Sequence, residues 1–298
     1  MQRAMRPRII PTTPRHALTL GAIVTTAFGC SADTKGTTTK SDVGDVADSG
    51  TIQDPGTYGA CTSKSPTALA PDLTGRWAIR TVASRYVPKT GLTSAFYTKT
   101  ISVILGDQTQ TGTDVSLSAE YCSQKAEDPD SLAHIIIPDS YVKSLKPFVR
   151  TGGVALGNAG AEVFAMPSFI EVVGALLADP ASDPLPVDAT DARLLDQDND
   201  GNPGITIKLS GLASGDLYVA QRQTSTWTGI AVGVDRVEGH YAFTSEQNVV
   251  AAEPTALKSL AAQTAIVDPN TCASTFVMVR VGAATTCAEV LANASQFD

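Results

Sequence analysis

The sequence contains few of the residue types on which most enzymes depend. It has three histidines among 298 residues, and only His134 and His240 lie beyond residue 29. Neither stands at a metal-ligand spacing, and the chain contains no Gly-x-Ser-x-Gly motif, no zinc-type cysteine pattern and no phosphate-binding loop. The sequence therefore predicts a protein that is not an enzyme.

Positive charge is also scarce. Residues 1–29 hold four of the 22 basic side chains and none of the 30 acidic ones, which leaves residues 30–298 with a net charge of −12. Binding to nucleic acid requires clustered Lys and Arg against the phosphates. The composition therefore predicts no nucleic-acid partner.

Long apolar runs are absent beyond residues 17–28, which are too few to span a bilayer comfortably. Four arginines precede this run, and the small residues Ala27 and Gly29 stand just before Cys30. A basic segment, a short apolar run and small residues together are typical of a secretion signal. Residues 1–29 are therefore predicted to be a signal peptide.

The four residues that end at Cys30 resemble the lipidation motif of bacterial lipoproteins. This resemblance implies that Cys30 is acylated and anchors the protein to a membrane, and Ser31 after it suits the outer membrane of the cell envelope. Two other interpretations remain open. One is an ordinary signal peptide cut near Gly29, and the other is an apolar run that stays uncleaved.

The chain divides by composition. Residues 30–70 are rich in Thr, Ser, Asp, Gly and Lys and have almost no large apolar side chains, so we expect a flexible tether. Residues 71–298 have ample apolar content for a core, and we expect them to form a single β-rich domain.

Alternation of apolar and polar residues dominates this domain. Val115, Leu117, Ala119 and Tyr121 alternate with polar residues, which is typical of a half-buried strand. Further strands are expected at 75–86, 97–105, 135–137, 205–209, 217–223, 228–234, 240–247 and 276–281. The pattern predicts an all-β fold, either an antiparallel barrel or a β-sandwich.

Few segments favour helix. Residues 167–178 begin with a proline and place Phe169, Val172, Val173 and Leu176 on one helical face. A second short helix is expected at residues 255–264, and a terminal turn at 289–294.

Four cysteines remain after Cys30, and an even number in an oxidising compartment predicts two disulfides. They are Cys61, Cys122, Cys272 and Cys287. A straight strand over residues 274–281 would hold the last two cysteines apart. We therefore favour bridges from Cys61 and Cys122 to the C-terminal pair, with free buried thiols as the alternative.

The strongest chemical motif is an acidic loop that begins at Asp196 and continues through Asp198, Asp200 and Asn202. Three carboxylates at alternate positions, followed by a glycine for a sharp turn, suit an oxygen-coordinated Ca²⁺ ion. The loop resembles the calcium loops of EF-hands and of calcium-bearing β-repeat proteins, but its twelfth position is Ile207, which offers no carboxylate. Backbone carbonyls, water, or Asp188 and Asp191 would have to complete a structural calcium site. The alternative is a metal-free acidic turn.

Two segments carry a second resemblance. A Gly-x-Trp at residues 75–77 and a late arginine, Arg280, are similar to those of lipocalin-type barrels. The resemblance implies a structural cation–π pair between Trp77 and Arg280 at the barrel floor. It also makes residues 139–195 an insertion. The alternative is that Trp77 is simply a core residue.

Residues 167–281 also resemble uncharacterised bacterial outer-membrane lipoproteins that carry an Asp-x-Asp-x-Asp-Gly-x-Pro-Gly loop before a strand. No activity follows from that resemblance. The sequence leaves two main functions open. One is a lipoprotein that binds an apolar small molecule or lipid inside its barrel, and the other is a calcium-stabilised structural or protein-interaction domain.

Overall fold

The computed structural model describes Cys61 and residues 72–88, 95–156, 162–260 and 265–298. The chain divides into two units, residues 1–49 and 50–298, and all described residues belong to the second. The predicted signal peptide, the lipidation site Cys30 and almost all of the tether therefore lie outside the described residues. No described helix is long and apolar enough to cross a membrane.

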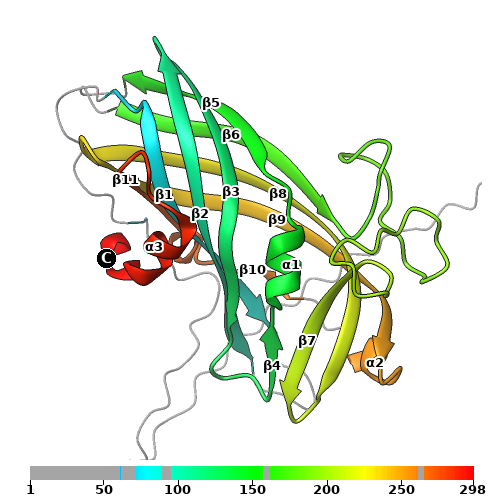
Figure 1. Cartoon of the computed structure of the whole chain (residues 1–298). Coiled ribbons are helices and arrows are strands. Elements are labelled where there is room, and N and C mark those ends of the chain that lie inside the picture. Colours follow the sequence, from blue (N-terminus) through cyan, green and yellow to red (C-terminus); the bar gives the residue numbers. More distant parts are fainter. Residues whose placement is uncertain (1–60, 62–71, 89–94, 157–161, 261–264) are drawn as a thin grey trace, which may run out of the picture. The chain divides into compact units, whose positions relative to one another are not determined.

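Strands make up most of the described chain (Figure 1). They are β1 (Gly75–Val87), β2 (Phe96–Thr111), β3 (Asp114–Glu127), β4 (Ala133–Ile136), β5 (Phe148–Leu156), β6 (Glu162–Val173), β7 (Ile205–Gly211), β8 (Gly215–Gly233), β9 (Arg236–Glu253), β10 (Ile266–Val267) and β11 (Thr275–Val281). The helices are α1 (Asp139–Ser144), α2 (Leu257–Leu260) and α3 (Cys287–Ala292), with 3₁₀ turns at Thr271–Ala273 and Ala294–Phe297. The all-β class expected from the sequence is confirmed.

Eight of these strands close into a hydrogen-bonded ring. Its order is β1–β2–β3–β5–β6–β8–β9–β11, which follows the order of the chain, and β11 pairs back with β1. Every pairing is antiparallel. The ring is therefore an up-and-down β-barrel.

The barrel wall opens at one end, between β3 on one side and β6 and β7 on the other. The β3–β5 ladder runs from Asp114 to Ala119 on β3, while β3 itself continues to Glu127 along β2. On the other side, β8 pairs with β6 from Gln221 onward and with β7 before it. Helix α1 lies against β3 and β7 at this end, and β4 extends β7 (Figure 1).

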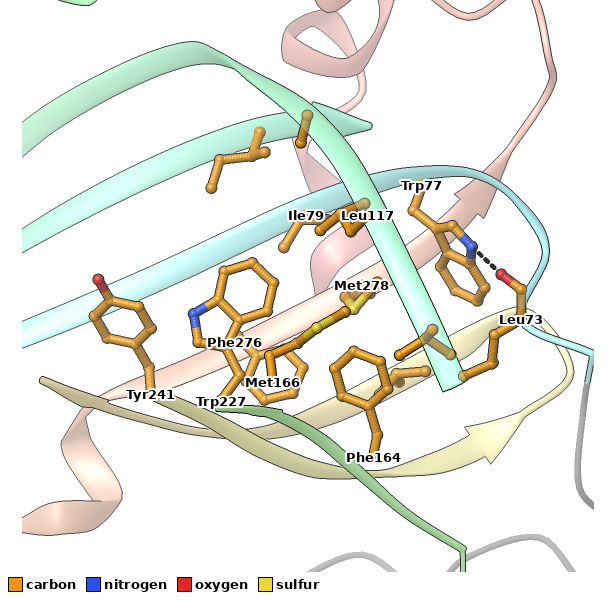
Figure 2. Packing of buried hydrophobic residues seen from close by; sticks show 14 of the residues in the cluster. Leu73, Trp77, Ile79, Leu117, Phe164, Met166, Trp227, Tyr241, Phe276 and Met278 are labelled. Atoms are coloured by element: carbon orange, nitrogen blue, oxygen red, sulfur yellow. Dashed lines mark hydrogen bonds between the residues drawn. The ribbon is translucent and has the colours of Figure 1, made fainter. Parts of the chain in front are cut away.

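Alternate residues of the ring strands point inward and form the main core. Figure 2 shows the cluster, in which Trp77 lies at one end and Tyr241 at the other. The Trp77 side chain is fully buried, and its indole N–H donates to the Leu73 carbonyl oxygen at 2.9 Å. Between the two ends the interior is filled by large apolar side chains, among them Leu117, Phe164, Met166, Trp227, Phe276 and Met278.

Two disulfides connect the barrel to distant parts of the chain. Cys61 pairs with Cys272, and Cys122 on β3 pairs with Cys287 at the start of α3. Each bridge joins one of the first two cysteines to the C-terminal pair, as favoured from the sequence, which left open which cysteine joins which. The second bridge holds α3 against the outside of the barrel, where Val290 packs on Ala78 and Leu105. The bridges span 211 and 165 residues, so each constrains the unfolded chain strongly.

The helix expected at residues 167–178 is wrong, because most of this segment belongs to β6. The inward positions are Phe169, Glu171 and Val173, two residues apart, and the backbone pairs with β8. Pro167 lies within a register shift of that pairing, where its missing N–H is tolerated. Pairing in the ring therefore outweighed the helical spacing of the apolar residues.

The expected insertion at residues 139–195 is also wrong. Residues 148–156 and 162–173 are ring strands β5 and β6, without which the barrel could not close. Segments 217–223 and 228–234, expected as two strands, belong to one long strand, β8. Of the helix expected at 255–264, residues 257–260 are helical, and 261–264 lie outside the described residues. The expected terminal turn corresponds to the end of α3 and the turn that follows it.

Candidate functional site

The acidic loop brings three carboxylates together between β6 and β7. One oxygen from each of Asp196, Asp198 and Asp200 lies within 4.8 Å of the others. The chain makes this turn with left-handed backbone at Asn199, where φ is 57°, and at Gly201, where φ is 89°. The loop therefore gathers oxygen ligands of the kind that Ca²⁺ prefers.

Hydrogen bonds hold most of these oxygens in place. Asp196 accepts from the backbone N–H groups of Asp200 and Gly201 at 3.1 and 3.0 Å. Thr206 donates its backbone N–H to Asp198 Oδ2 at 3.1 Å and its hydroxyl to Asp200 Oδ2 at 2.5 Å. The second oxygen, Asp198 Oδ1, is buried and has no hydrogen-bond partner among the described residues.

The Asp198 carboxylate is destabilised where it lies. Burial raises the pKa of Asp198, and the negative charges of Asp200 and Asp196 raise it further, against the hydrogen bond from Thr206. A bound cation would remove this repulsion and give Asp198 Oδ1 a partner. The set of carboxylate oxygens therefore fits a calcium ion.

The other predicted ligands are placed less directly. Asn202 donates its backbone N–H to Asp200 Oδ1 at 2.9 Å, so it lies next to the cluster. Asp191 pairs with Arg193 at 2.6 Å, and Asp188 accepts from Thr190 at 2.9 and 2.8 Å. Asp188 and Asp191 thus form turns of their own and do not complete the site.

The loop is tied to the open end of the barrel through Gln197. Its side-chain oxygen accepts from the Gly174 N–H at 2.9 Å, and its amide donates to the Ser144 carbonyl at the end of α1 at 3.2 Å. At Gly204, a Cβ atom would lie 2.4 Å from the Val219 carbonyl oxygen, so only glycine fits there. The acidic loop therefore connects β6, α1 and β8.

At the opposite end, Arg280 lies over Trp77. Its guanidinium carbon is 4.6 Å from the Trp77 ring centroid, and its Nε pairs with Asp235 at 2.8 Å. A Cβ on Gly75 would lie 2.6 Å from Arg280, which explains the glycine two residues before the tryptophan. The contacts are those of a structural closure, worth about 0.5–2 kcal/mol for the cation–π pair.

A second polar site lies inside the barrel near its open end. It is a cavity of about 20 Å³, large enough for one or two water-sized species. The lining comes from seven ring strands, β1, β2, β3, β5, β6, β8 and β9, and its polar residues are Thr81, Ser102, Tyr121, Gln124, Arg150, Glu171, Gln223, Ser225 and Tyr241. The site could not be recognised in the sequence, because its two charged residues, Arg150 and Glu171, are far apart in the chain.

Arg150 is the most deeply buried charge of the cavity, with 4% of its surface exposed. It donates to the Ser225 hydroxyl and carbonyl oxygens at 3.0 Å each and to the Pro167 carbonyl at 3.1 Å. Its guanidinium stacks on Trp227, 4.4 Å from the ring centroid. Burial lowers the pKa of Arg150 to about 10, so the side chain stays charged at neutral pH.

Glu171 is the carboxyl group that faces this arginine across the cavity. Burial raises its pKa, while the hydrogen bond from the Tyr121 hydroxyl to Glu171 Oε2 at 3.0 Å and the charge of Arg150 oppose the shift. Burial also raises the pKa of Tyr121 well above its usual value and that of Tyr241 to about 12. Both phenols therefore remain neutral hydrogen-bonding groups.

Neither histidine builds a catalytic site. His134 lies on β4, and its Nδ1 is 3.1 Å from Asp128 Oδ1. No serine or cysteine nucleophile is hydrogen-bonded to the imidazole of His134 in the described structure. His240 lies on β9, and its Nδ1 is buried without a hydrogen-bond partner among the described residues. Neither histidine ring is therefore hydrogen-bonded to a serine or cysteine side chain among the described residues.

Fold and sites together define a disulfide-linked, up-and-down eight-stranded β-barrel that carries an acidic loop at its open end. No protein-family model, no curated protein and no solved structure matches the chain.

Proposed function

We propose that the protein is a non-enzymatic, calcium-stabilised structural or protein-interaction domain of the cell envelope. The observation that carries this proposal is the filled barrel. Large apolar side chains occupy the interior from Trp77 to Tyr241, and the cavity lined by Arg150 and Glu171 measures about 20 Å³. Its function would then depend on a rigid outer surface rather than on a pocket.

The filled interior favours this function over the binding of an apolar small molecule or lipid. Pockets for such ligands measure about 300–1,000 Å³ and enclose most of the ligand. An open groove of about 650 Å³ does lie along β2, β3, β5 and β6, but short side chains line it, chiefly Thr109, Thr111, Ser116 and Thr151 with two glycines. Such a groove does not enclose an apolar molecule, and it suits contact with another macromolecule better.

Calcium supports the structural function through the acidic loop. The loop joins α1 and β6 through Gln197, and its three carboxylates repel one another without a cation. A bound ion would therefore hold α1 over the open end of the barrel and stabilise the fold. Binding to the folded state alone stabilises a protein by about 2.7 kcal/mol at a calcium concentration of 100 Kd.

Thermal unfolding in calcium chloride and in EGTA tests this proposal. We expect calcium to raise Tm in the wild type and to have no effect on the double variant Asp198→Asn, Asp200→Asn. Asp188→Asn is the matched control, because Asp188 lies in a neighbouring turn outside the cluster, and it should keep the full calcium response. A wild type with the same Tm in both buffers would refute the calcium site.

We further propose that acylation of Cys30 anchors this domain at the outer membrane, on the evidence of the sequence motif alone. Cys30→Ser should move the protein from the membrane fraction to the soluble fraction and abolish incorporation of labelled fatty acid. Unchanged incorporation would show that the acyl chain is attached elsewhere or that the motif is not used.

A further inference from the structure

Two buried N–H groups of the barrel cavity have no acceptor. Arg150 Nε and Trp227 Nε1 are both buried and without a hydrogen-bond partner among the described residues. Both side chains line the same cavity, and both are less than 5% exposed. Figure 2 shows the indole nitrogen on the side of Trp227 that faces Tyr241, another lining residue. Two donors thus share one small space that offers them no acceptor.

The charge of Arg150 is not matched by a close carboxylate either. No ion pair within 4.0 Å involves this arginine among the described residues, although other arginines of the barrel, such as Arg236 and Arg222, have one. The backbone and hydroxyl oxygens that it contacts carry no net charge. A buried cation in such surroundings favours a negatively charged partner.

Glu171 supplies the carboxyl group of the cavity wall, but its surroundings make it a poor negatively charged partner for Arg150. Burial favours its uncharged form, and the Tyr121 hydroxyl occupies its Oε2 oxygen. Below this raised pKa the uncharged carboxyl group neither neutralises Arg150 nor repels another anion, and its O–H can donate a hydrogen bond; above it the carboxylate would repel an anion.

We propose that the cavity between Arg150, Trp227 and Glu171 binds a small monovalent anion of the size of chloride. The anion would accept hydrogen bonds from Arg150 Nε and Trp227 Nε1 and would neutralise the buried guanidinium. The available space admits one atom of this size and excludes carboxylates with side chains, nucleotides and lipids. This site is independent of the calcium loop and of the proposed structural function.

Quenching of tryptophan fluorescence by bromide in the full chain tests the proposal. Bromide is close to chloride in size and quenches an indole on contact, and the chain has two tryptophans, Trp77 and Trp227, both buried. Bromide would replace gluconate at constant ionic strength. We expect a saturable loss of the Trp227 emission, and we expect chloride to reverse it by competition.

Two arginine variants distinguish an anion site at Arg150 from a general effect of replacing an arginine in the barrel. Arg150→Lys removes Nε and should weaken bromide binding at least tenfold. Arg85→Lys is the matched control, because Arg85 is partly buried and also stacks on an aromatic ring, that of Phe243, but does not line the cavity. It should leave the bromide affinity unchanged within twofold. Near-UV circular dichroism would establish that each variant is folded.

Glu171→Gln provides a test in the opposite direction. It removes the one carboxyl group of the cavity, so bromide should bind more tightly at pH 8 and lose its pH dependence. The groups that face Glu171 are Tyr121, Tyr141, Tyr241 and Arg150. The three phenols stay neutral and Arg150 stays charged between pH 5 and pH 8, so Glu171 would account for any weakening of wild-type binding as pH rises.

Linear quenching that chloride does not relieve, equal in the wild type and in all three variants, would overturn the proposal and leave water as the occupant. Saturable quenching that Arg150→Lys and Arg85→Lys reduce equally would also overturn it, because the anion would then bind elsewhere. Should Arg150→Lys not fold, the direction of the Glu171→Gln effect decides the question.

Discussion

The two ends of the barrel differ in what their inward positions bury. At the closed end, inward positions carry Trp77, Leu117 and Met278, and Arg280 keeps its charge at the surface beside Asp235. At the open end, strands β5 and β6 turn Arg150 and Glu171 into the interior. The closed end thus buries apolar side chains, whereas the open end also buries a charged group that requires a partner.

The difference follows from how each end is closed. The closed end is sealed by continuous hydrogen bonding and by stacking of Arg280 on Trp77. The open end lacks direct pairing between β3 and β7, and α1 fills the gap with Tyr141 and Val142. A helix held by side-chain contacts can be stabilised or released more easily than a strand in a ladder. The acidic loop is bonded to this helix.

Truncation at the closed end should have the largest effect on stability. Trp77→Ala removes a fully buried side chain and its bond to Leu73, so we expect a loss of about 3–5 kcal/mol in the free energy of unfolding. Chemical denaturation measures this change. Trp77→Phe keeps much of the volume and should cost less. A loss below about 1 kcal/mol for the alanine variant would show that the closed end does not carry the core.

At the open end we expect a smaller change in the free energy of unfolding, and it should be a gain in stability. The pKa of Glu171 is raised in the folded state, so the stability it contributes is complete below its unfolded pKa and is lost as pH rises through its folded pKa. Glu171→Gln keeps an acceptor for Tyr121 and removes this loss. We expect the variant to be more stable than the wild type at pH 8 and to show no such advantage at pH 4.

Thermal unfolding at the two pH values measures the difference between variant and wild type. Glu120→Gln is the control, since Glu120 is an exposed glutamate on β3, and it should leave the pH dependence as it is. The expectation would be contradicted if the stability of Glu171→Gln relative to the wild type were lower at pH 8 than at pH 4. The carboxylate of Glu171 would then be ionised and paired in the folded wild type.

Features encoded by neighbouring residues could be predicted from the sequence. The period of two in residues 115–121 identified a half-buried strand, and the spacing of Asp196, Asp198 and Asp200 identified a carboxylate cluster that the fold does assemble. A straight strand that separates Cys272 from Cys287 also predicted that neither would pair with the other, but it could not predict which of them joins Cys61 and which joins Cys122.

Features that depend on the closed ring could not be predicted in the same way. Residues 167–178 have apolar side chains at both helical and strand spacings, and pairing with β8 decides between them. The cavity is lined from seven ring strands, which close around it only in the folded barrel. Charged residues at inward positions of strands, Arg150 on β5 and Glu171 on β6, were the signals in the sequence that could have pointed to it.

Hydrogen–deuterium exchange with and without calcium tests the central claim most directly, because it reports on both ends of the barrel in one experiment. The account predicts that calcium slows exchange in residues 196–204, in α1 and at the start of β7, and leaves the strand segments around Trp77 and Met278 unchanged. Equal exchange throughout, with and without calcium, would contradict a metal-stabilised open end and leave the acidic loop as a simple turn.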